Sequence, residues 1–423
     1  MKTGANHPTQ VQAVPVYSRY YQLLGPGILF AATAIGVSHL VQSTRAGALY
    51  GLAMMPILLI ACAAKYPSLL IGLLYPARTG KTLLQGYRQQ GWWALGTYLV
   101  ITLYSMWFVL AAIAITTAGL VQALMPFEIS IELATAGVLA IAVLILLSGH
   151  YQGLEHVSKI LIGLLALLLP IATLMVLPET DFSPAAWSIE TWDLTTIAFI
   201  IALTGWMPIP IDASVMTSTW VTSRNEANQE QTTTSDARID FNVGYALTIL
   251  FALCFLILGA SVMRTSGTPL PAAAGSFAVM VIEMFTRQLG QWSYYLIGTV
   301  ALVTMFTTLL AVMDGQSRVI QYAFRTIRPD QLIRPRMYSA TLLVYALGGM
   351  AIVAFFMRDF STFINFATSL GFLMAPVAVV LNHRAMFTDG ILREYKYLYW
   401  GSITGGTLLC IASSVYFYLI IFT

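Results

Sequence analysis

The sequence predicts an all-α protein that crosses a membrane about eleven times, with two sets of five helices and one further helix. Three observations predict this fold class. Of the 423 residues, 58% are hydrophobic and only 9% are charged, whereas a soluble domain carries about 25% charged residues. The apolar residues gather in runs of about 20, the length that spans a bilayer. Two runs, in matching places of the two halves, are interrupted by polar residues with Gly or Pro.

Eleven apolar segments have the length of a membrane span. They are 22–48, 52–76, 95–121, 130–148, 157–177, 194–221, 239–263, 292–316, 338–357, 361–382 and 398–421. We expect one transmembrane domain over residues 1–423, with a first repeat at 22–177, a second at 194–382 and an extra C-terminal span at 398–421. An odd number of spans in each set gives the sets opposite orientations, as in the inverted repeats of many secondary transporters.

The interruptions lie at Gly36–His39 in the first span and at Trp206–Asp212 in the sixth. Non-helical backbone at membrane depth persists only where protein or a water-filled cavity covers it. We therefore expect Gly36–His39 and Trp206–Pro210 to be non-helical, and to face each other around a substrate site near the middle of the membrane.

Basic residues predict the orientation, because Lys and Arg gather in cytoplasmic loops. They follow spans two, four, eight and ten, whereas the loop after span five carries four acidic residues and no basic one. The loop after span six is mixed in charge. We expect a cytoplasmic N-terminus and a C-terminus outside, in the inner (plasma) membrane of a bacterium. The polar segment Met1–Arg19 has no apolar centre, which argues against a cleavable signal peptide.

Several function classes are disfavoured by the sequence. The three cysteines lie within apolar runs and show neither a disulfide nor a metal pattern. No Walker-type phosphate loop, Ser-His-Asp order or HExxH motif occurs. The net charge of +3 gives no indication of nucleic-acid binding. We expect a protein that is not an enzyme and has no cofactor, whose partners are a small-molecule or metal-ion substrate and the lipid bilayer.

Four motifs resemble the Nramp (natural resistance-associated macrophage protein) divalent-metal transporters. They are Gly25–Gly27, Ala46–Gly51, Met207-Pro208 and Gly153–Lys159. The resemblance runs from about Leu23 to span ten. It implies a LeuT-like 5+5 inverted repeat with discontinuous spans 1 and 6, and secondary active transport of a divalent metal cation, with or without coupling to protons.

The chain departs from the family where the metal binds. The family's Asp-Pro-Gly-Asn corresponds to Gly36-Val37-Ser38-His39, and the histidine of its Met-Pro-His corresponds to Ile209. A further family histidine corresponds to Ser214. Met207 is kept, and Thr204 matches a residue that contributes a backbone carbonyl. The resemblance and the residues together place a substrate site at Gly36, Ser38, His39, Thr204, Met207 and Asp212.

Two residues of this site have alternative roles. A divalent cation favours at least one carboxylate ligand, which Asp212 would supply in place of Gly36, together with His39 and Met207 as the candidate metal ligands. Alternatively, His39 forms hydrogen bonds to free backbone at the break. Asp212 carries a cation or a proton, or only caps the helix that follows it.

Lys65, Asp212 and Asp314 are the candidate coupling or gating residues. An unpaired ammonium in the middle of span two is unfavourable, so we expect Lys65 to pair with Asp212, Asp314 or a carbonyl freed by Pro67, or to snorkel to the interface. Such a cation repels a metal and suits an anionic or zwitterionic organic solute. For Asp314 we expect a salt bridge at the cytoplasmic rim, or a gate.

Other polar and aromatic side chains of the spans also have two interpretations. Their hydroxyl and amide groups line the transport path or bond to the carbonyls of their own helices: Thr304, Thr307, Thr308, Asn365, Thr368 and Ser369. Tyr104, Trp107 and Trp206 shape a pocket for an organic solute or only pack. Divalent-metal transport is the leading interpretation, transport of a small organic solute is its alternative, and a channel or receptor on the same scaffold is a third.

Overall fold

The computed structural model describes residues 25–422 except 149–150, 265–270, 272, 331–334, 357–358 and 388–394. Within these ranges every regular element is a helix. The first half contains α2 (Pro26–Ala34), η1 (Ser38–Ser43), α3 (Thr44–Tyr50), η2 (Gly51–Ala53), α4 (Met54–Thr79), α5 (Leu83–Gln90), α6 (Trp92–Leu124), α7 (Ile131–Leu147), α8 (Tyr151–Val176), η3 (Leu177–Glu179) and η4 (Pro184–Trp187). The second half contains α9 (Leu194–Trp206), α10 (Ala213–Asn228), α11 (Thr234–Leu258), η5 (Gly259–Met263), α13 (Ala274–Leu289), η6 (Gln291–Ser293), α14 (Tyr294–Ile327), α15 (Pro335–Phe356), α16 (Phe360–Phe387) and α17 (Lys396–Phe422).

The described residues of each of the eleven predicted spans are helical, apart from span ends and the interruptions in the first and sixth spans. Within the described residues, eight helical segments are long and apolar enough to cross a membrane, and α7 and α9 are shorter apolar helices. The protein is an integral membrane protein. The first and sixth spans are each divided in two, into α2 and η1–α3 in the first half and into α9 and α10 in the second.

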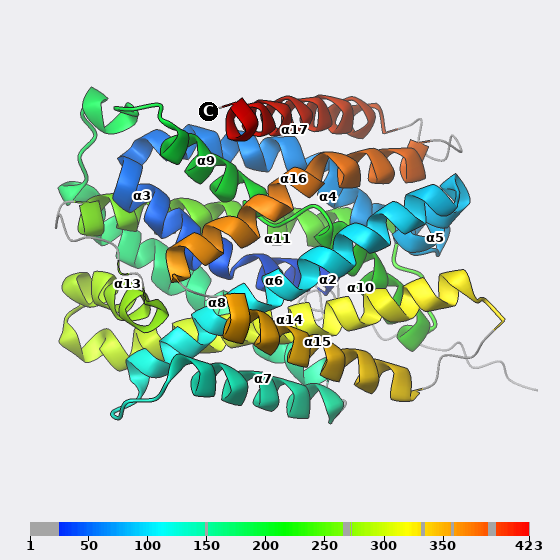
Figure 1. The fold of residues 1–423 in the computed structure, drawn as a ribbon, viewed down its shortest axis with the longest axis horizontal. Helices are drawn as coiled ribbons and strands as arrows, with labels where there is room; N and C mark the ends of the chain where they lie inside the picture. The colour runs from blue at the N-terminus through cyan, green and yellow to red at the C-terminus, as the bar shows by residue number, and fades with distance from the viewer. Residues whose placement is uncertain are drawn as a thin grey trace, which may run out of the picture.

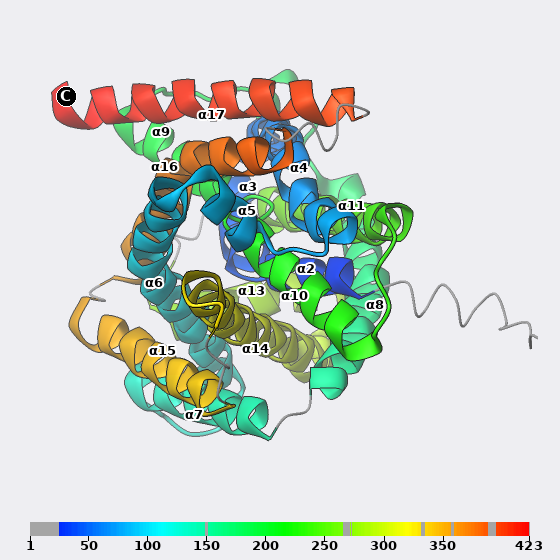
Figure 2. The same ribbon diagram turned by 90° about the vertical axis from the view of Figure 1, so that its right-hand side faces the viewer.

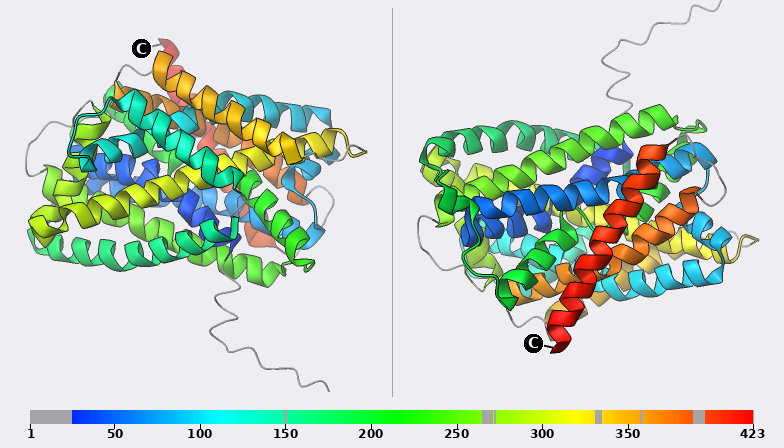
Figure 3. Two further views of the ribbon diagram at one scale, coloured as in Figure 1. Left: turned by 90° about the horizontal axis from the view of Figure 1, so that it is seen from below. Right: turned by 90° about the horizontal axis from the view of Figure 1, so that it is seen from above.

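The broken helices lie inside the bundle (Figures 1 and 2). Figure 2 shows α2, α10 and α14 near the centre, α17 along one edge, and α7 and α15 along the opposite edge. Helix α11 packs on α2, and α16 packs on α9. Helix α17, the extra span, lies across the surface of α4 and α16, as the right-hand view of Figure 3 shows.

The start of α2 is fixed by a close contact with α11. The carboxylate of Asp240 accepts hydrogen bonds from the backbone N–H groups of Gly25 at 3.1 Å and Gly27 at 2.7 Å. These are donors that a helix N-terminus leaves unpaired. A Cβ atom at Gly27 would lie only 2.3 Å from the Asp240 carbonyl oxygen, so this approach of the two helices requires glycine.

Both breaks are present, but their bounds differ from those predicted. The first break covers only Ile35 and Gly36, and Ser38 and His39 belong to the π-helical turn η1. The prediction that Gly36–His39 is non-helical is therefore correct at Gly36 and wrong at Val37, Ser38 and His39. The physical reason is that the helix resumes at once, because the Leu40 N–H donates to the Gly36 carbonyl at 2.9 Å.

The second break is longer than predicted and begins one residue later. Trp206 is the last residue of α9, and the interruption runs from Met207 to Asp212. Pro208 and Pro210 have no N–H group to donate to the preceding turn, which ends the helix here. Helix α10 starts only after Asp212, at Ala213.

Candidate functional site

The two breaks face each other across a small internal cavity. The Ser38 hydroxyl approaches the Pro208 carbonyl oxygen to 3.3 Å. The cavity has a volume of about 40 Å³, room for about one water molecule. Its polar lining residues come from α2, η1, the end of α9, the second break and α14: Thr33, Ser38, Trp206, Asp212, Thr308 and Gln316. The predicted juxtaposition of the two breaks is confirmed.

Lys65 of α4 occupies the second break. Its Nζ atom donates to the carbonyls of Thr204 at 2.6 Å and Gly205 at 2.7 Å, and more weakly to that of Ile209 at 3.4 Å. In a continuous helix the Thr204 carbonyl would accept from residue 208, but Pro208 has no N–H. The fully buried ammonium replaces the missing donors and lies at the negative end of the α9 dipole.

The expected partners of Lys65 were wrong. They were Asp212, Asp314 or a carbonyl freed by Pro67, but its hydrogen bonds go to carbonyls of α9 and the second break. The physical reason is that the break leaves carbonyl oxygens unpaired at the same depth, and a helix C-terminus attracts a cation. Snorkelling is excluded, because the side chain is completely buried.

Asp212 lies between two cavities. It lines the 40 Å³ cavity and a second one of about 10 Å³ on the side of Tyr98 and α16. It occupies the position before α10, but its side chain makes no capping hydrogen bond. Lys65 attracts the carboxylate without forming a salt bridge within 4 Å in the described part of the chain. The backbone N–H groups of Asp212 and Ala213 also stabilise the carboxylate, so its partners are local backbone and a nearby ammonium.

His39 points away from the cavity. Its Nε2 atom lies 2.9 Å from the Thr248 carbonyl oxygen of α11, and its Nδ1 atom lies 2.8 Å from the Ser38 hydroxyl. The hydroxyl also approaches the Ala34 carbonyl at 2.8 Å. Both ring nitrogens are thus engaged, which is the arrangement expected of a histidine that satisfies backbone.

The candidate metal ligands do not form a metal site in this structure. The cavity is lined by Asp212, but neither by His39 nor by Met207, which is fully buried in the hydrophobic core. Among the described residues, no group of three His, Cys, Asp or Glu side chains is arranged to hold a metal ion. The Thr204 carbonyl, the remaining candidate ligand, accepts from Lys65.

Gly36 has no room for the aspartate that the Nramp pattern would place there. A Cβ atom at this position would lie 2.8 Å from Cγ2 of Thr308. The Thr308 hydroxyl donates toward the Ala32 carbonyl at 2.7 Å and the Ile35 carbonyl at 3.3 Å. Thr308 therefore holds the end of α2 and lines the cavity at the same time.

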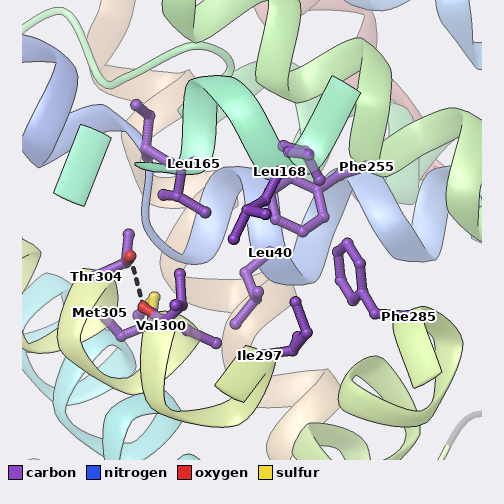
Figure 4. Close-up of a pocket in the computed structure, with 12 residues that line it drawn as sticks. Leu40, Leu165, Leu168, Phe255, Phe285, Ile297, Val300, Thr304 and Met305 are labelled. Carbon is purple, nitrogen blue, oxygen red and sulfur yellow. Dashed lines mark hydrogen bonds between the residues drawn. The ribbon is translucent and has the colours of Figure 1, made fainter. Parts of the chain in front are cut away.

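The other two candidate threonines of α14 bond to their own helix. Thr304 donates to the Val300 carbonyl at 2.7 Å, and Thr307 donates to that of Val303 at 2.8 Å. Figure 4 shows Thr304 at a different cavity of about 40 Å³. Side chains of α8 and α14 approach each other there, and the lining is otherwise entirely apolar, which makes this cavity a poor site for a charged substrate.

Asp314 forms the expected salt bridge, with Arg318 Nε at 2.7 Å. Its carboxylate also accepts from Trp220 Nε1 at 3.1 Å and from the Tyr338 hydroxyl at 2.9 Å. These contacts join α10, α14 and α15. Closer to the ends of α10 and α14, an ion pair between Glu226 of α10 and Arg325 of α14, at 2.9 Å, also joins these two helices.

Two charged residues in or beside the divided spans, Asp240 and Arg45, make contacts that were not predicted. Asp240 caps α2, and its position inside an apolar span was a usable signal. Arg45 carried the same signal, since it is a charge in the apolar first span, yet it was given no role. The structure places it beside α16, where its guanidinium contacts Gln42 and Asn365.

Comparisons with known proteins establish a family and a fold. No family model matches the chain. An uncharacterized protein of Pasteurella multocida (strain Pm70) is 32% identical over 389 residues, which is 91% of this chain and 89% of that protein. The chain belongs to the family of this Pasteurella protein.

Solved structures similar to this family member are transporters of the LeuT fold. A mutant of the Eremococcus coleocola manganese transporter matches with a TM-score of 0.70 and 17% identity, over 98% of this chain and 91% of that one. MhsT in complex with L-phenylalanine matches with a TM-score of 0.66 and 12% identity, over 92% of this chain and 97% of that one. Mhp1, a nucleobase-cation-symport-1 family transporter, matches with a TM-score of 0.59 and 16% identity, over 93% of this chain and 91% of that one. The predicted LeuT-like fold is confirmed, while the cargoes of these neighbours differ.

Proposed function

We propose that the protein is a secondary transporter that carries a small organic solute through the site between the two breaks. The observation that carries the proposal is the Lys65 ammonium beside the cavity, which donates hydrogen bonds to the carbonyls of Thr204 and Gly205. Two unit positive charges about 4 Å apart repel each other by about 4 kcal/mol at an effective dielectric constant of about 20. A divalent ion would be repelled twice as strongly.

The transport cycle needs elements that move and a source of energy. The proposal assigns the two five-span repeats, 22–177 and 194–382, to the moving elements, and an ion gradient to the energy source. Asp212 is the candidate carrier of the coupling proton or cation, since it faces two cavities without a capping contact. The Asp314 cluster is a candidate gate at the end where α10, α14 and α15 meet. The proposed topology has the N-terminus in the cytoplasm.

Divalent-metal transport is the second candidate. The likeness to the manganese transporter favours it, as do the Met207-Pro208 and Gly25–Gly27 motifs of Nramp type. In that case Asp212 would have to supply the carboxylate that Gly36 lacks, and the ion would have to bind despite Lys65.

Uptake into liposomes separates these candidates. The purified protein is reconstituted and given either radiolabelled manganese or members of a panel of organic solutes, with and without an imposed proton gradient. We expect saturable uptake of a solute and no uptake of manganese above empty liposomes. Manganese uptake that is lost in both Asp212→Asn and Met207→Ala would favour the metal candidate instead. A flux far above the turnover of a carrier would indicate a channel.

A further inference from the structure

A second buried cation, Arg45, lies where α3, α9 and α16 meet. Its side chain is 5% exposed. Its Nη1 atom donates to Oε1 of Gln42 at 3.0 Å and to Oδ1 of Asn365 at 2.9 Å. Its guanidinium carbon lies 5.4 Å from the centre of the Phe199 ring. The hydrogen-bond acceptors are neutral amides, so these contacts orient the guanidinium without neutralising its charge.

One edge of the Arg45 guanidinium has no acceptor. Both of its hydrogen bonds in the described part of the chain come from Nη1, and the buried Nε has no partner there. No carboxylate of the described residues lies within 4 Å. Asp359 attracts the charge from farther away, and its carboxylate accepts the Thr362 N–H instead. A buried donor without an acceptor costs about 1–3 kcal/mol, so this arrangement is expected to have a function.

A row of polar groups extends from Arg45 along α16 toward Trp206. Gln42 Nε2 donates to Asn365 at 3.3 Å and to the Thr368 hydroxyl at 3.1 Å. One turn further along α16, a Cβ atom at Gly371 would lie 2.8 Å from the Trp206 ring. Trp206 lines the cavity, and its buried Nε1 is a second donor without a partner among the described residues.

We propose that this row, which consists of Gln42, Arg45, Trp206, Asn365 and Thr368, binds a carboxylate group of the transported solute on its path to the cavity. The inference rests on the proposed function and narrows its substrate to a carboxylate-bearing solute. The Nε–Nη2 edge of a guanidinium binds a carboxylate through two parallel hydrogen bonds.

The charges around the path agree with this substrate class. Arg45 and Lys65 are buried cations near the path, and Asp212 is the only acidic residue that lines the cavity. A carboxylate of the solute is attracted by the Arg45 guanidinium, and a metal ion is repelled by it. Because a substrate amide would present an N–H₂ group to the same donors, the site discriminates against the neutral amide of a carboxylic acid.

Thermal unfolding of the purified full chain tests the site directly. The probes are succinate, lactate, benzoate and the proteinogenic L-amino acids, each compared with its amide. We expect at least one carboxylate to raise the melting temperature and its amide to have no effect. Arg45→Gln should weaken that binding about 10- to 100-fold, the factor that a charge-assisted hydrogen bond contributes. Arg45→Lys, which keeps the charge and loses the fork, should retain part of the binding.

A matched control and a second variant keep the test decisive. Arg264→Gln changes a partly exposed arginine that already faces Glu190 at 3.9 Å, and it should leave carboxylate binding unchanged. Asn365→Asp keeps both acceptor contacts and adds a carboxylate next to Arg45. It should abolish the response to the probes and raise the melting temperature of the ligand-free protein, so it remains informative if Arg45→Gln fails to fold.

Each outcome distinguishes this inference from the proposed function. The inference is overturned if no carboxylate probe binds, if amides bind equally well, or if binding survives both Arg45→Gln and Asn365→Asp. Uptake of a neutral or cationic solute that Arg45→Gln leaves unchanged would support the proposed function and overturn the inference. If Arg45→Gln removes carboxylate binding but the wild-type protein takes up no solute, the proposed transport function is overturned. The carboxylate-binding site is then still supported.

Discussion

The two breaks satisfy their free backbone carbonyls in different ways. At the first break, hydroxyl groups accomplish this. Thr308 donates toward the carbonyls of Ala32 and Ile35, and Ser38 lies 2.8 Å from that of Ala34. At the second break, the ammonium of Lys65 donates to three carbonyls. The first break is therefore stabilised by neutral hydroxyl groups, and the second by a cation that also attracts the Asp212 carboxylate of the same break.

The difference follows from the length of each interruption. Two residues, Ile35 and Gly36, separate α2 from the helical turn that follows, so only a few carbonyls lose their partners. Six residues separate α9 from α10, and two of them are prolines without N–H groups. A gap of that length needs a donor with several hydrogens, and an ammonium has three. The charge of the site is consequently set by the second break.

Lys65→Met should have the largest effect on stability. It leaves the carbonyls of Thr204 and Gly205 buried without a donor, at about 1–3 kcal/mol for each. We expect the free energy of unfolding to fall by about 2–5 kcal/mol, measured by thermal unfolding in detergent. Lys81→Met, at an exposed lysine, is the control and should change little. A Lys65→Met protein as stable as the wild type would show that other groups satisfy these carbonyls.

Gly36→Ala should rank second, because the first break is tightly packed. The added Cβ atom would lie 2.8 Å from Cγ2 of Thr308, and overpacking of this kind costs about 1–3 kcal/mol. Thr308→Ser removes that methyl group and keeps the hydroxyl, so the double variant should recover most of the loss. Additive losses in the double-mutant cycle would contradict the contact. If the rest of the site can hold a metal, Gly36→Asp should strengthen manganese binding only when it is combined with Thr308→Ser.

Thr308→Val should have a smaller effect, of about 1–2 kcal/mol. Valine keeps the shape of the side chain and loses the hydroxyl that donates toward the carbonyls of Ala32 and Ile35. Thr304→Val is the matched control on the same helix, since its hydroxyl bonds only to Val300. Thermal unfolding of the two variants measures the difference. Equal losses would mean that the hydroxyl of Thr308 has no special role at the break.

The sequence predicts the spans better than the contacts between them. Hydropathy and the Gly and Pro residues locate all eleven helical segments and both breaks, because these depend on local composition. The partners of Lys65 could not be predicted, since three carbonyls of another helix become its acceptors only after α4 packs beside the break. For the same reason, neither the orientation of His39 toward α11 nor the free edge of Arg45 is visible in the sequence.

Asp212→Asn should have the smallest effect on stability. The Asp212 side chain makes no capping hydrogen bond and no salt bridge within 4 Å in the described ranges. Asparagine has nearly the same shape and caps a helix comparably well. The amide oxygen of Asn can still accept from the backbone N–H groups of residues 212 and 213, so we expect a change within about 0.5 kcal/mol. The charge that it removes is one of the few at the cavity between the breaks.

If Asp212 carries the coupling proton or cation, the same variant should abolish gradient-driven uptake, because an amide cannot bind and release a proton as a carboxylate does. Uptake into liposomes under an imposed proton gradient measures this, with the melting temperature as the control for folding. Lys65→Met should show the opposite pattern. It should lower the melting temperature more than Asp212→Asn does, because the Lys65 ammonium donates to backbone carbonyls. Near-normal uptake by Asp212→Asn would remove Asp212 from the mechanism, and the coupling group would then have to be sought elsewhere along the path.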